Sequence, residues 1–222
     1  QARASEFELA LQAYTRALRE DRSLIPAWVG QVQMLVELGE YAEARLWADK
    51  SLELFRNNGD LLAAKARACV RMRDMRAAEI CSDASVSAPG SSPGRWLSRG
   101  EVMLLSSPAR ARDCFEKSLA EPGTDWYERV LIARAYLFHD KPAVATEFAT
   151  LAQEMNPRHA PPWIVLARCH MAHGRMDRAQ TCVARALEID PQNRIARLVR
   201  SETTSAGTYR TLGRVLKGWL SR

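Results

Sequence analysis

Two histidines, His170 and His173, come closest to a metal-binding arrangement, because they stand three residues apart directly after Cys169. A zinc site needs three or four converging ligands, and this stretch does not supply them. The position of His170 also recurs earlier in the chain, where it is filled by Leu35, Cys69, Met103 and Tyr136. We therefore interpret His170 as a packing residue and expect no metal ion.

Signatures of phosphate binding and of catalysis are missing as well. The stretch Gly90–Gly94 looks glycine-rich, but it lacks the lysine of a phosphate-binding loop, so we interpret it as a linker between helices. The sequence contains no GKS or GKT loop and no G-x-G-x-x-G, H-E-x-x-H or G-x-S-x-G motif. We expect no catalytic residues, no cofactor and no enzymatic activity.

The cysteines indicate the compartment. There are five, an odd number, without a metal-ligating spacing such as C-x-x-C: Cys69, Cys81, Cys114, Cys169 and Cys182. Each falls within a helical segment, which indicates core filling by reduced thiols. A reducing environment follows, and neither a signal peptide nor a membrane-spanning apolar run is present, so we predict a cytoplasmic protein. Because the sequence begins at Gln1, inside a repeat, we expect further sequence upstream.

The helices that carry these residues recur at a fixed interval. One alanine marks each repeat, at intervals of 34, 34, 33, 34 and 34 residues: Ala10, Ala44, Ala78, Ala111, Ala145 and Ala179. A second small position lies seven residues after each alanine and holds Ala17, Ser51, Ser85, Ser118, Ala152 and Ala186. An internal period of this length is typical of a helical solenoid.

Each repeat also contains a position for a large residue, which we call the anchor. The anchors lie fifteen or sixteen residues before the alanines and are Trp28, Leu62, Trp96, Arg129 and Trp163. Four residues after them stand Val32, Ala66, Gly100, Ala133 and Ala167. Two antiparallel helices per repeat explain this pattern, because small side chains let the helix axes approach and the anchor fills the groove left by the neighbour.

Turn residues separate the helices. Gly39 and Gly174 end the first helix of a repeat, and Pro157 and Pro191 mark the exit from the second. The interval that is one residue short falls at Ser106–Pro108, where a turn absorbs it. The sequence thus predicts paired helices along most of its length.

In combination, these positions resemble the tetratricopeptide repeat. One repeat reads Trp28…Val32…Gly39-x-Tyr41-x-x-Ala44…Ser51-Leu52, and another reads Trp163…Leu166-Ala167…Gly174-x-Met176-x-x-Ala179…Ala186-Leu187-Glu188-Ile189-Asp190-Pro191. The resemblance covers about residues 1–193. The middle repeats depart from the family pattern, with Leu62 and Arg129 in place of Trp and Pro142 at a turn position that is usually aromatic.

The resemblance implies an all-α fold, a right-handed α-α superhelix of antiparallel helix pairs with about six repeats and a C-terminal capping helix. Residues 1–23 would form the second helix of a partial first repeat, and residues 24–193 five tetratricopeptide-type repeats. Residues 194–222 would form basic amphipathic helices that cap the solenoid or dock elsewhere.

In this family, the first helices of successive repeats line a concave groove where ligands bind. A mostly polar row lies five residues after the anchors and consists of Gln33, Arg67, Glu101, Arg134 and Arg168. The apolar contacts that we favour flank it: Val130, Leu137, Ile164 and Met171. We predict that this groove binds a peptide or helix of a partner protein, with a carboxylate on Arg134 or Arg168. The alternative is that these inner side chains pack on neighbouring helices or pair with one another.

The basic character of the chain is confined to its end. Seven basic residues and one acid follow residue 193 and account for the whole net charge of +6, so we predict no nucleic-acid binding. An apolar stripe there, including Leu212 and Leu216, stands opposite the basic residues. Three interpretations stay open: a cap, a docking helix for an acidic partner or another subunit, and a membrane-surface helix. The docking residues would be Arg210, Arg214, Lys217 and Trp219.

From these patterns we predict a non-catalytic scaffold for protein–protein interactions that binds a partner in its concave groove. It would be a bacterial cytoplasmic adaptor or the interaction module of a longer protein. The alternative is a peripheral membrane or assembly factor that acts through the basic C-terminal helix, with self-association through the same helix. A liposome experiment with and without residues 207–222 separates the two.

Overall fold

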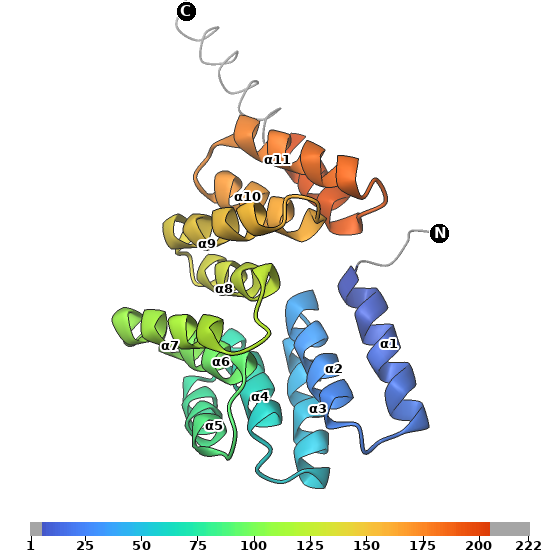
Figure 1. The fold of residues 1–222 in the computed structure, drawn as a ribbon, viewed down its shortest axis with the longest axis vertical. Coiled ribbons are helices and arrows are strands. Elements are labelled where there is room, and N and C mark those ends of the chain that lie inside the picture. Colours follow the sequence, from blue (N-terminus) through green and yellow to red (C-terminus); the bar gives the residue numbers. More distant parts are fainter. Residues whose placement is uncertain (1–5, 205–222) are drawn as a thin grey trace, which may run out of the picture. The chain divides into compact units, whose positions relative to one another are not determined.

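The computed structural model of the chain describes residues 6–204, and its regular structure in that range is α-helical (Figure 1). The helices are α1 (Glu6–Glu20), α2 (Ile25–Leu38), α3 (Tyr41–Leu54), α4 (Gly59–Arg71), α5 (Met75–Ser87), α6 (Pro93–Met103), α7 (Pro108–Ala120), α8 (Trp126–Phe138), α9 (Pro142–Met155), α10 (Ala160–Ala172) and α11 (Met176–Ile189). Residues 194–204 are helical as well.

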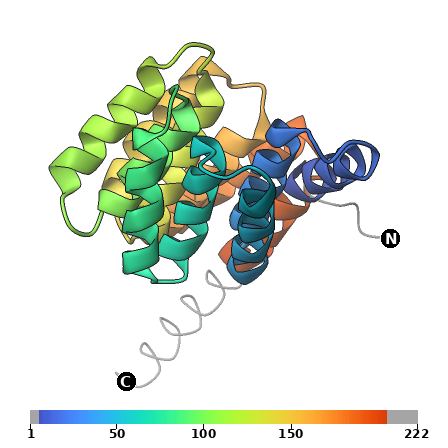
Figure 2. The same cartoon turned by 90° about the horizontal axis from the view of Figure 1, so that it is seen from below.

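The chain forms two compact parts, which are described separately. Over the described residues, the N-terminal part comprises residues 6–128 and holds α1 to α7, and the C-terminal part comprises residues 129–204 and holds most of α8, then α9 to α11. Within the N-terminal part, α2 packs on α3, α4 on α5 and α6 on α7, as neighbouring helix pairs (Figures 1 and 2). In the C-terminal part α10 packs on both α9 and α11.

The small positions lie where helices approach most closely. The marker alanines Ala44, Ala78, Ala111, Ala145 and Ala179 are all 0% exposed. The second small position is equally buried from Ser51 onward, and its serines donate to backbone carbonyls. Ser85 Oγ donates to the Gly59 carbonyl at 2.7 Å, and Ser118 Oγ donates to the Pro93 carbonyl at 2.8 Å. A larger side chain at these positions would push the helices apart, which explains why only Ala and Ser occur there.

The anchor Trp28 sits in a buried cluster with Leu18, Ala27 and Leu61. Its indole N–H donates to the Arg22 carbonyl, six residues earlier, at 2.9 Å. Trp163 makes the same bond to the Pro157 carbonyl at 2.9 Å. The indole thus fills apolar space and also satisfies a carbonyl in the preceding turn, which fixes how the first helix enters each of these two repeats.

Four of the turns inside repeats share one conformation, in which a residue with positive φ follows the first helix. These residues are Gly39, Arg73, Asp140 and Gly174, with φ of 89°, 63°, 55° and 69°. In each case the next N–H donates to the carbonyl five residues earlier, for example Glu40 to Leu35 at 2.9 Å. This is the Schellman pattern, which closes a helix at its C-terminus. The turn between α6 and α7 is one residue shorter than these turns. It is closed by a hydrogen bond of 2.8 Å from the Ser107 N–H to the Met103 carbonyl.

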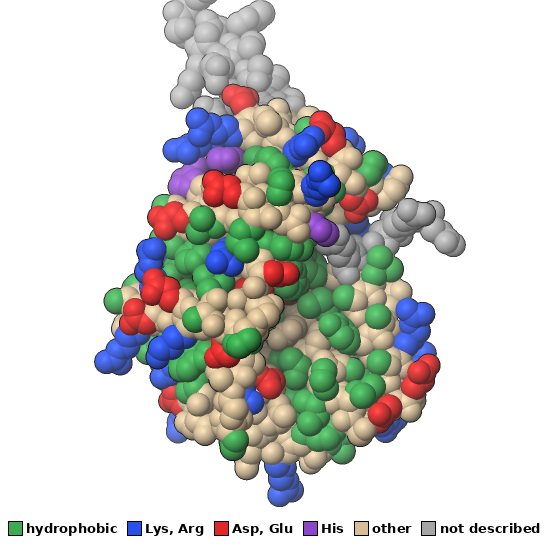
Figure 3. All heavy atoms as spheres, in the orientation of Figure 1, with side chains coloured by type: hydrophobic (Ala, Val, Ile, Leu, Met, Phe, Trp, Pro, Cys, Tyr) green, Lys and Arg blue, Asp and Glu red, His purple; other side chains and the backbone are tan. Residues whose placement is uncertain are grey.

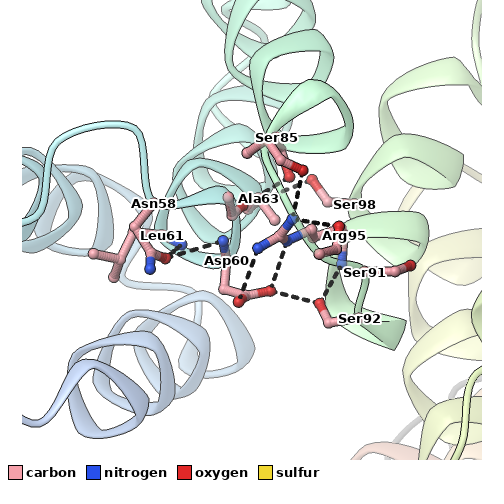
Figure 4. A network of polar contacts seen from close by, with 12 residues as sticks. Asn58, Asp60, Leu61, Ala63, Ser85, Ser91, Ser92, Arg95 and Ser98 are labelled. Atoms are coloured by element: carbon pink, nitrogen blue, oxygen red, sulfur yellow. Dashed lines mark hydrogen bonds and ion pairs between the residues drawn. The ribbon is translucent and has the colours of Figure 1, made fainter.

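The linker Gly90–Gly94 is held by one arginine at the start of α6 (Figure 4). Arg95 Nη1 donates to three carbonyls that follow the end of α5, those of Ala88, Pro89 and Gly90, at 3.1, 2.9 and 2.9 Å. Its Nε donates to Asp60 Oδ1 on α4 at 3.1 Å. Because Arg95 is buried and satisfies these carbonyls, it fixes the connection between α5 and α6. The predicted linker was placed too far along the chain, because Pro93 and Gly94 are the first residues of α6 and the connection spans residues 88–92.

Candidate partner-binding face

In the N-terminal part, two residues of the polar row that we predicted from the sequence, Arg67 and Glu101, belong to a buried ion network. Arg67 on α4 donates from Nη2 to Glu37 on α2 at 2.8 Å and from Nε to Glu101 on α6 at 2.9 Å. Arg71, one turn after Arg67, donates from Nε to the other oxygen of Glu101 at 2.7 Å. These side chains are no more than 4% exposed. The network therefore joins three successive first helices.

The electrostatics of this network favour the charged forms. Burial by itself lowers the pKa of a guanidinium, but the carboxylates of Glu101 and Glu37 outweigh it, so the pKa values of Arg67 and Arg71 lie above the ordinary value. Removing a single member would leave a buried charge without its counter-ion. This role in helix packing occupies Arg67 and Glu101, and their predicted contact with a partner stays a prediction.

Sequence analysis missed two members of the network, Glu37 and Arg71. Each stands one helical turn after a residue of the polar row. The signal available in the sequence was that residues at matching positions of neighbouring repeats carry opposite charges. The third predicted residue of this part, Gln33, is half-buried on α2, and its amide nitrogen lies near the start of α6, 3.5 Å from where a Cβ on Gly94 would be.

In the C-terminal part the predicted residues differ in exposure. Two apolar residues are buried and form the floor of the face, and the others can be reached from solvent. Val130 on α8 and Ile164 on α10 are buried, at 0% and 4% exposure. Arg134 and Leu137 on α8 are half-buried, and so is Met171 on α10. Arg168 on α10 is exposed. Water and a ligand can therefore reach the cationic and the apolar rows here, whereas the two deepest apolar residues support them from below.

The row around Arg168 continues on residues 194–204. Arg168 is close enough to Glu202 and to Arg134 for their charges to act on it in opposite directions. Its pKa is lowered, mainly because neighbouring protein displaces water and further because of Arg134, but a guanidinium remains charged at every physiological pH. Sequence analysis did not assign Glu202 or Leu198 to this row, and Leu198 is 53% exposed. The anchor spacing, extended to residue 197, would have found both.

Apolar side chains also reach the surface elsewhere. Figure 3 shows such side chains over α1 to α3 of the N-terminal part. Leu9 on α1 and Leu24 in the following turn are 55% and 41% exposed. On the C-terminal part Phe138, at the end of α8, is 41% exposed and lies one turn beyond Arg134. Arg134 and Phe138 thus place cationic and apolar surface on one helix.

The residues that could have carried chemistry are placed as packing groups. The five cysteines are free and buried, and burial raises the pKa of Cys69 and of Cys169 to about 11, which makes both poor nucleophiles. The pKa of His170 is lowered by burial and then by Arg178, Arg175 and His173, a cationic setting that opposes metal binding. Between residues 6 and 204 no group of three or more His, Cys, Asp or Glu side chains could hold a metal ion.

The predicted docking residues Arg210, Arg214, Lys217 and Trp219 lie outside the described residues. Among the helices of the described range, none combines the length and the apolar character needed to cross a membrane.

Comparison with known proteins agrees with the helix pairs. Two family models described as tetratricopeptide repeat match the chain, one over residues 1–59 and the other over residues 139–201, together just over half of the chain. No curated protein matches the sequence.

Solved structures share the fold at low identity. A tetratricopeptide repeat protein from Parabacteroides merdae is 17% identical, with a TM-score of 0.58 over 90% of this chain and 78% of that one. A thermophilic tetratricopeptide repeat protein from Thermus thermophilus is 18% identical, with a TM-score of 0.55 over 89% and 98%. The APC/C hetero-tetramer Cut9–Hcn1 is 15% identical, with a TM-score of 0.52 over 89% of this chain and 39% of that one.

The predicted fold class is confirmed by these matches and by the paired helices: over residues 6–204 the chain is an all-α solenoid. The small positions and the anchors recur through residues 1–193, and the family models match the first and last of these repeats. The chain belongs to the tetratricopeptide repeat family.

Proposed function

We propose that the C-terminal part binds an acidic amphipathic peptide or helix of a partner protein on its inner face, along Arg134, Leu137, Arg168 and Met171. Members of this family are protein–protein interaction scaffolds that are generally not catalysts. The observation that carries the finer proposal is that Arg168 is exposed while the apolar Leu137 and Met171 beside its row are only half-buried.

The chemistry of this face fits a carboxylate flanked by apolar side chains. A guanidinium can donate two parallel hydrogen bonds to a carboxylate, which fixes the register of the ligand. The exposed parts of Leu137 and Met171 would supply apolar contact at about 25 cal/mol for each Å² removed from water. An amphipathic helix presents such groups three or four residues apart on one face, so that a single ligand helix can offer both kinds of contact.

The floor of the site makes it preorganised. Val130 and Ile164 are already buried in the free protein, so the rows above them are held by packed helices rather than by loops. Tyr136 on α8 also stacks on Phe148 of α9, with ring centroids 5.7 Å apart. A ligand would therefore have little protein ordering entropy to overcome.

A peptide selection tests the proposal. Phage-displayed helical peptides would be selected on the wild type, and their Kd would be measured against Arg168→Glu. The control is Arg178→Glu on α11, an exposed arginine on the second helix of its repeat, which changes the net charge equally. We expect an acidic residue flanked by apolar ones, and a Kd that rises about 30-fold or more in Arg168→Glu but changes little in the control.

Equal binding to the wild type and to Arg168→Glu, or peptides without acidic residues, would remove this face as the partner site.

We also propose that the interaction takes place in the cytoplasm, because all five cysteines are free thiols in the structure.

A further inference from the structure

Residues 194–204 have the register of the first helix of another repeat. Arg197 stands 34 residues after the anchor Trp163, and its Nε donates to the Pro191 carbonyl, six residues earlier, at 3.0 Å. Trp163 makes the equivalent bond at the same spacing. One of the tetratricopeptide matches also runs to residue 201. The described part of the solenoid therefore ends on a first helix, the kind of helix that lines the inner face.

This last helix carries an apolar residue and an acidic residue one turn apart, Leu198 and Glu202. They follow the anchor position by one and by five residues, as Ile164 and Arg168 do on α10. Leu198 is 53% exposed, whereas Ile164 is 4% exposed. Glu202 is exposed, as Arg168 is. Because residues one turn apart lie on the same face of a helix, the accessible surface around Arg168 continues onto residues 194–204 with both apolar and charged groups.

Arg168 and Glu202 occupy the repeat position at which the N-terminal part forms its ion network. There, Arg67 and Glu101 form an ion pair of 2.9 Å with side chains no more than 2% exposed. Arg168 and Glu202 are likewise 34 residues apart and opposite in charge, and Glu202 acts on Arg168 electrostatically. Within residues 6–204, however, neither of the two forms an ion pair or a side-chain hydrogen bond, and both are exposed. The pair that is closed in the N-terminal part is thus open in the C-terminal part.

We propose that Glu202 belongs to the partner-binding face and that the partner carries a basic residue opposite Glu202, beside the acidic residue that faces Arg168. This inference rests on the proposed function and narrows the partner from an acidic segment to a dipolar one. An open pair of opposite charges attracts a ligand whose charges stand in the reverse order. A purely acidic ligand would be repelled by Glu202, so this residue also selects against such partners.

The distance between the two helices limits how the partner's charges are arranged. The corresponding first helices of the N-terminal part, α4 and α6, pack directly on each other, and packed helices lie roughly 8 to 10 Å apart. A helical ligand that crosses them rises about 1.5 Å per residue, so seven residues, or two turns, cover this distance and return to the same face. In an extended ligand the distance corresponds to about three residues, which point to opposite faces. The arrangement therefore favours a helix with the two charges about seven positions apart.

The charges also relate the sequence of the partner to its direction on the face. Arg134 on α8 acts on Arg168 from another first helix, so the row reads basic, basic, acidic over three successive first helices. A partner helix whose acidic residues precede its basic residue would run from α8 towards residues 194–204. A partner with the reverse order would run the other way.

An exchange of charge between the protein and its ligand tests the proposal. Helical peptides selected on the wild type would be sequenced, and their Kd would be measured against Glu202→Lys. We expect a basic residue about seven positions from the acidic one, and a Kd that rises about 10-fold in Glu202→Lys. The matched control is Glu154→Lys on α9, an exposed acid on a second helix, which should change the Kd little. Replacing the basic residue of the peptide by glutamate should restore binding to Glu202→Lys, because the two opposite charges are then exchanged.

Acidic peptides without a basic residue, or equal binding to the wild type and to Glu202→Lys, would overturn this inference and leave the face around Arg168 as the partner site. A loss in Glu202→Lys that the exchanged peptide does not recover would also overturn it, because the substitution would then act on the helix and not on a contact. Equal binding to the wild type and to Arg168→Glu would instead overturn the proposed function, and this inference with it.

Discussion

Arg67 and Glu101 occupy the same position in successive repeats, 34 residues apart, and form an ion pair of 2.9 Å with side chains only 2% and 0% exposed. A solenoid brings matching positions of neighbouring repeats together. Opposite charges at such positions therefore convert a row of solvated side chains into a buried ion network. Arg67 also reaches Glu37 on the other side, so a single guanidinium connects α2, α4 and α6.

Replacing Arg67 should therefore cost far more than replacing a surface arginine. We expect Arg67→Leu to lower the free energy of unfolding by about 3 to 5 kcal/mol, because Glu37 and Glu101 would stay buried with less counter-charge. The matched control is Arg45→Ala, which removes an ion pair of 2.9 Å with Asp74 whose side chains are each 37% exposed. That change should cost about 1 kcal/mol or less. Urea unfolding followed by circular dichroism compares the two, and equal losses would show that burial adds nothing to the network.

The repeat frame could be predicted because its cause is steric. Paired helices approach closely only where both carry small side chains, so an alanine recurs in each repeat, and Ala44, Ala78 and Ala111 are indeed fully buried. The state of the polar row could not be predicted, because Arg67 reads the same in sequence whether it faces water or two carboxylates. The decisive partner, Glu37, lies one turn outside the row, and only packing shows that it reaches Arg67.

The candidate site was predictable in part. The rows containing Arg168 and Met171 follow from the repeat phase, whereas the division into a buried floor and an exposed row depends on how closely α8 and α10 pack. Sequence analysis expected a helix in residues 194–204 but not its repeat register, because the residue at the anchor spacing is Arg197 rather than tryptophan. A guanidinium replaces the indole there by donating to the same type of carbonyl, a substitution that periodicity of apolar residues does not reveal.

Two glycines in α6 should respond in opposite ways to alanine. A Cβ on Gly100 would lie 2.5 Å from Cε1 of Phe115, a fully buried ring, whereas a Cβ on Gly94 would find its nearest neighbour at 3.5 Å. We expect Gly100→Ala to destabilise the protein by about 1 to 3 kcal/mol through overpacking, despite the better helix propensity of alanine. Gly94→Ala should be neutral or stabilising by up to about 1 kcal/mol.

The double variant Gly100→Ala/Phe115→Leu checks the mechanism. If the clash with the ring causes the loss, the two changes should combine to less than the sum of their separate effects in thermal or urea unfolding. Simple additivity would mean that Gly100 matters for another reason.

Replacing the serines of the second small position by alanine should cost different amounts of unfolding free energy, depending on which carbonyl each hydroxyl binds. Ser85 Oγ donates across to the Gly59 carbonyl on α4, whereas Ser51 Oγ donates to the Ala48 carbonyl in its own helix at 2.8 Å. We expect Ser85→Ala to cost about 1 kcal/mol of unfolding free energy, because it removes a hydrogen bond between helices in the core. Ser51→Ala should change it by less than about 0.5 kcal/mol, since alanine favours the helix. A reversed order in urea unfolding would show that the bond to Gly59 is not stabilising.

The buried thiols predict a loss of stability in alkaline solution. Burial raises the pKa of Cys69 and of Cys169 from an ordinary value of about 9 to about 11. Their contribution to stability is fully present below pH 9. As the pH rises from about 9 to about 11, the unfolded chain releases these protons while the folded chain keeps them, so the free energy of unfolding falls with pH. Each thiol should account for about 2 to 3 kcal/mol over this window.

The double variant Cys69→Ala/Cys169→Ala separates this effect from other groups that titrate in the same range. At neutral pH it should be less stable than the wild type, because buried side-chain volume is lost. Between pH 9 and 11, however, its unfolding free energy should fall less steeply, so the two stability curves converge as the wild-type thiols are driven to ionise. Parallel curves across that window would mean that both thiols titrate alike in the folded and unfolded chains, and that the packing around Cys69 and Cys169 does not exclude water.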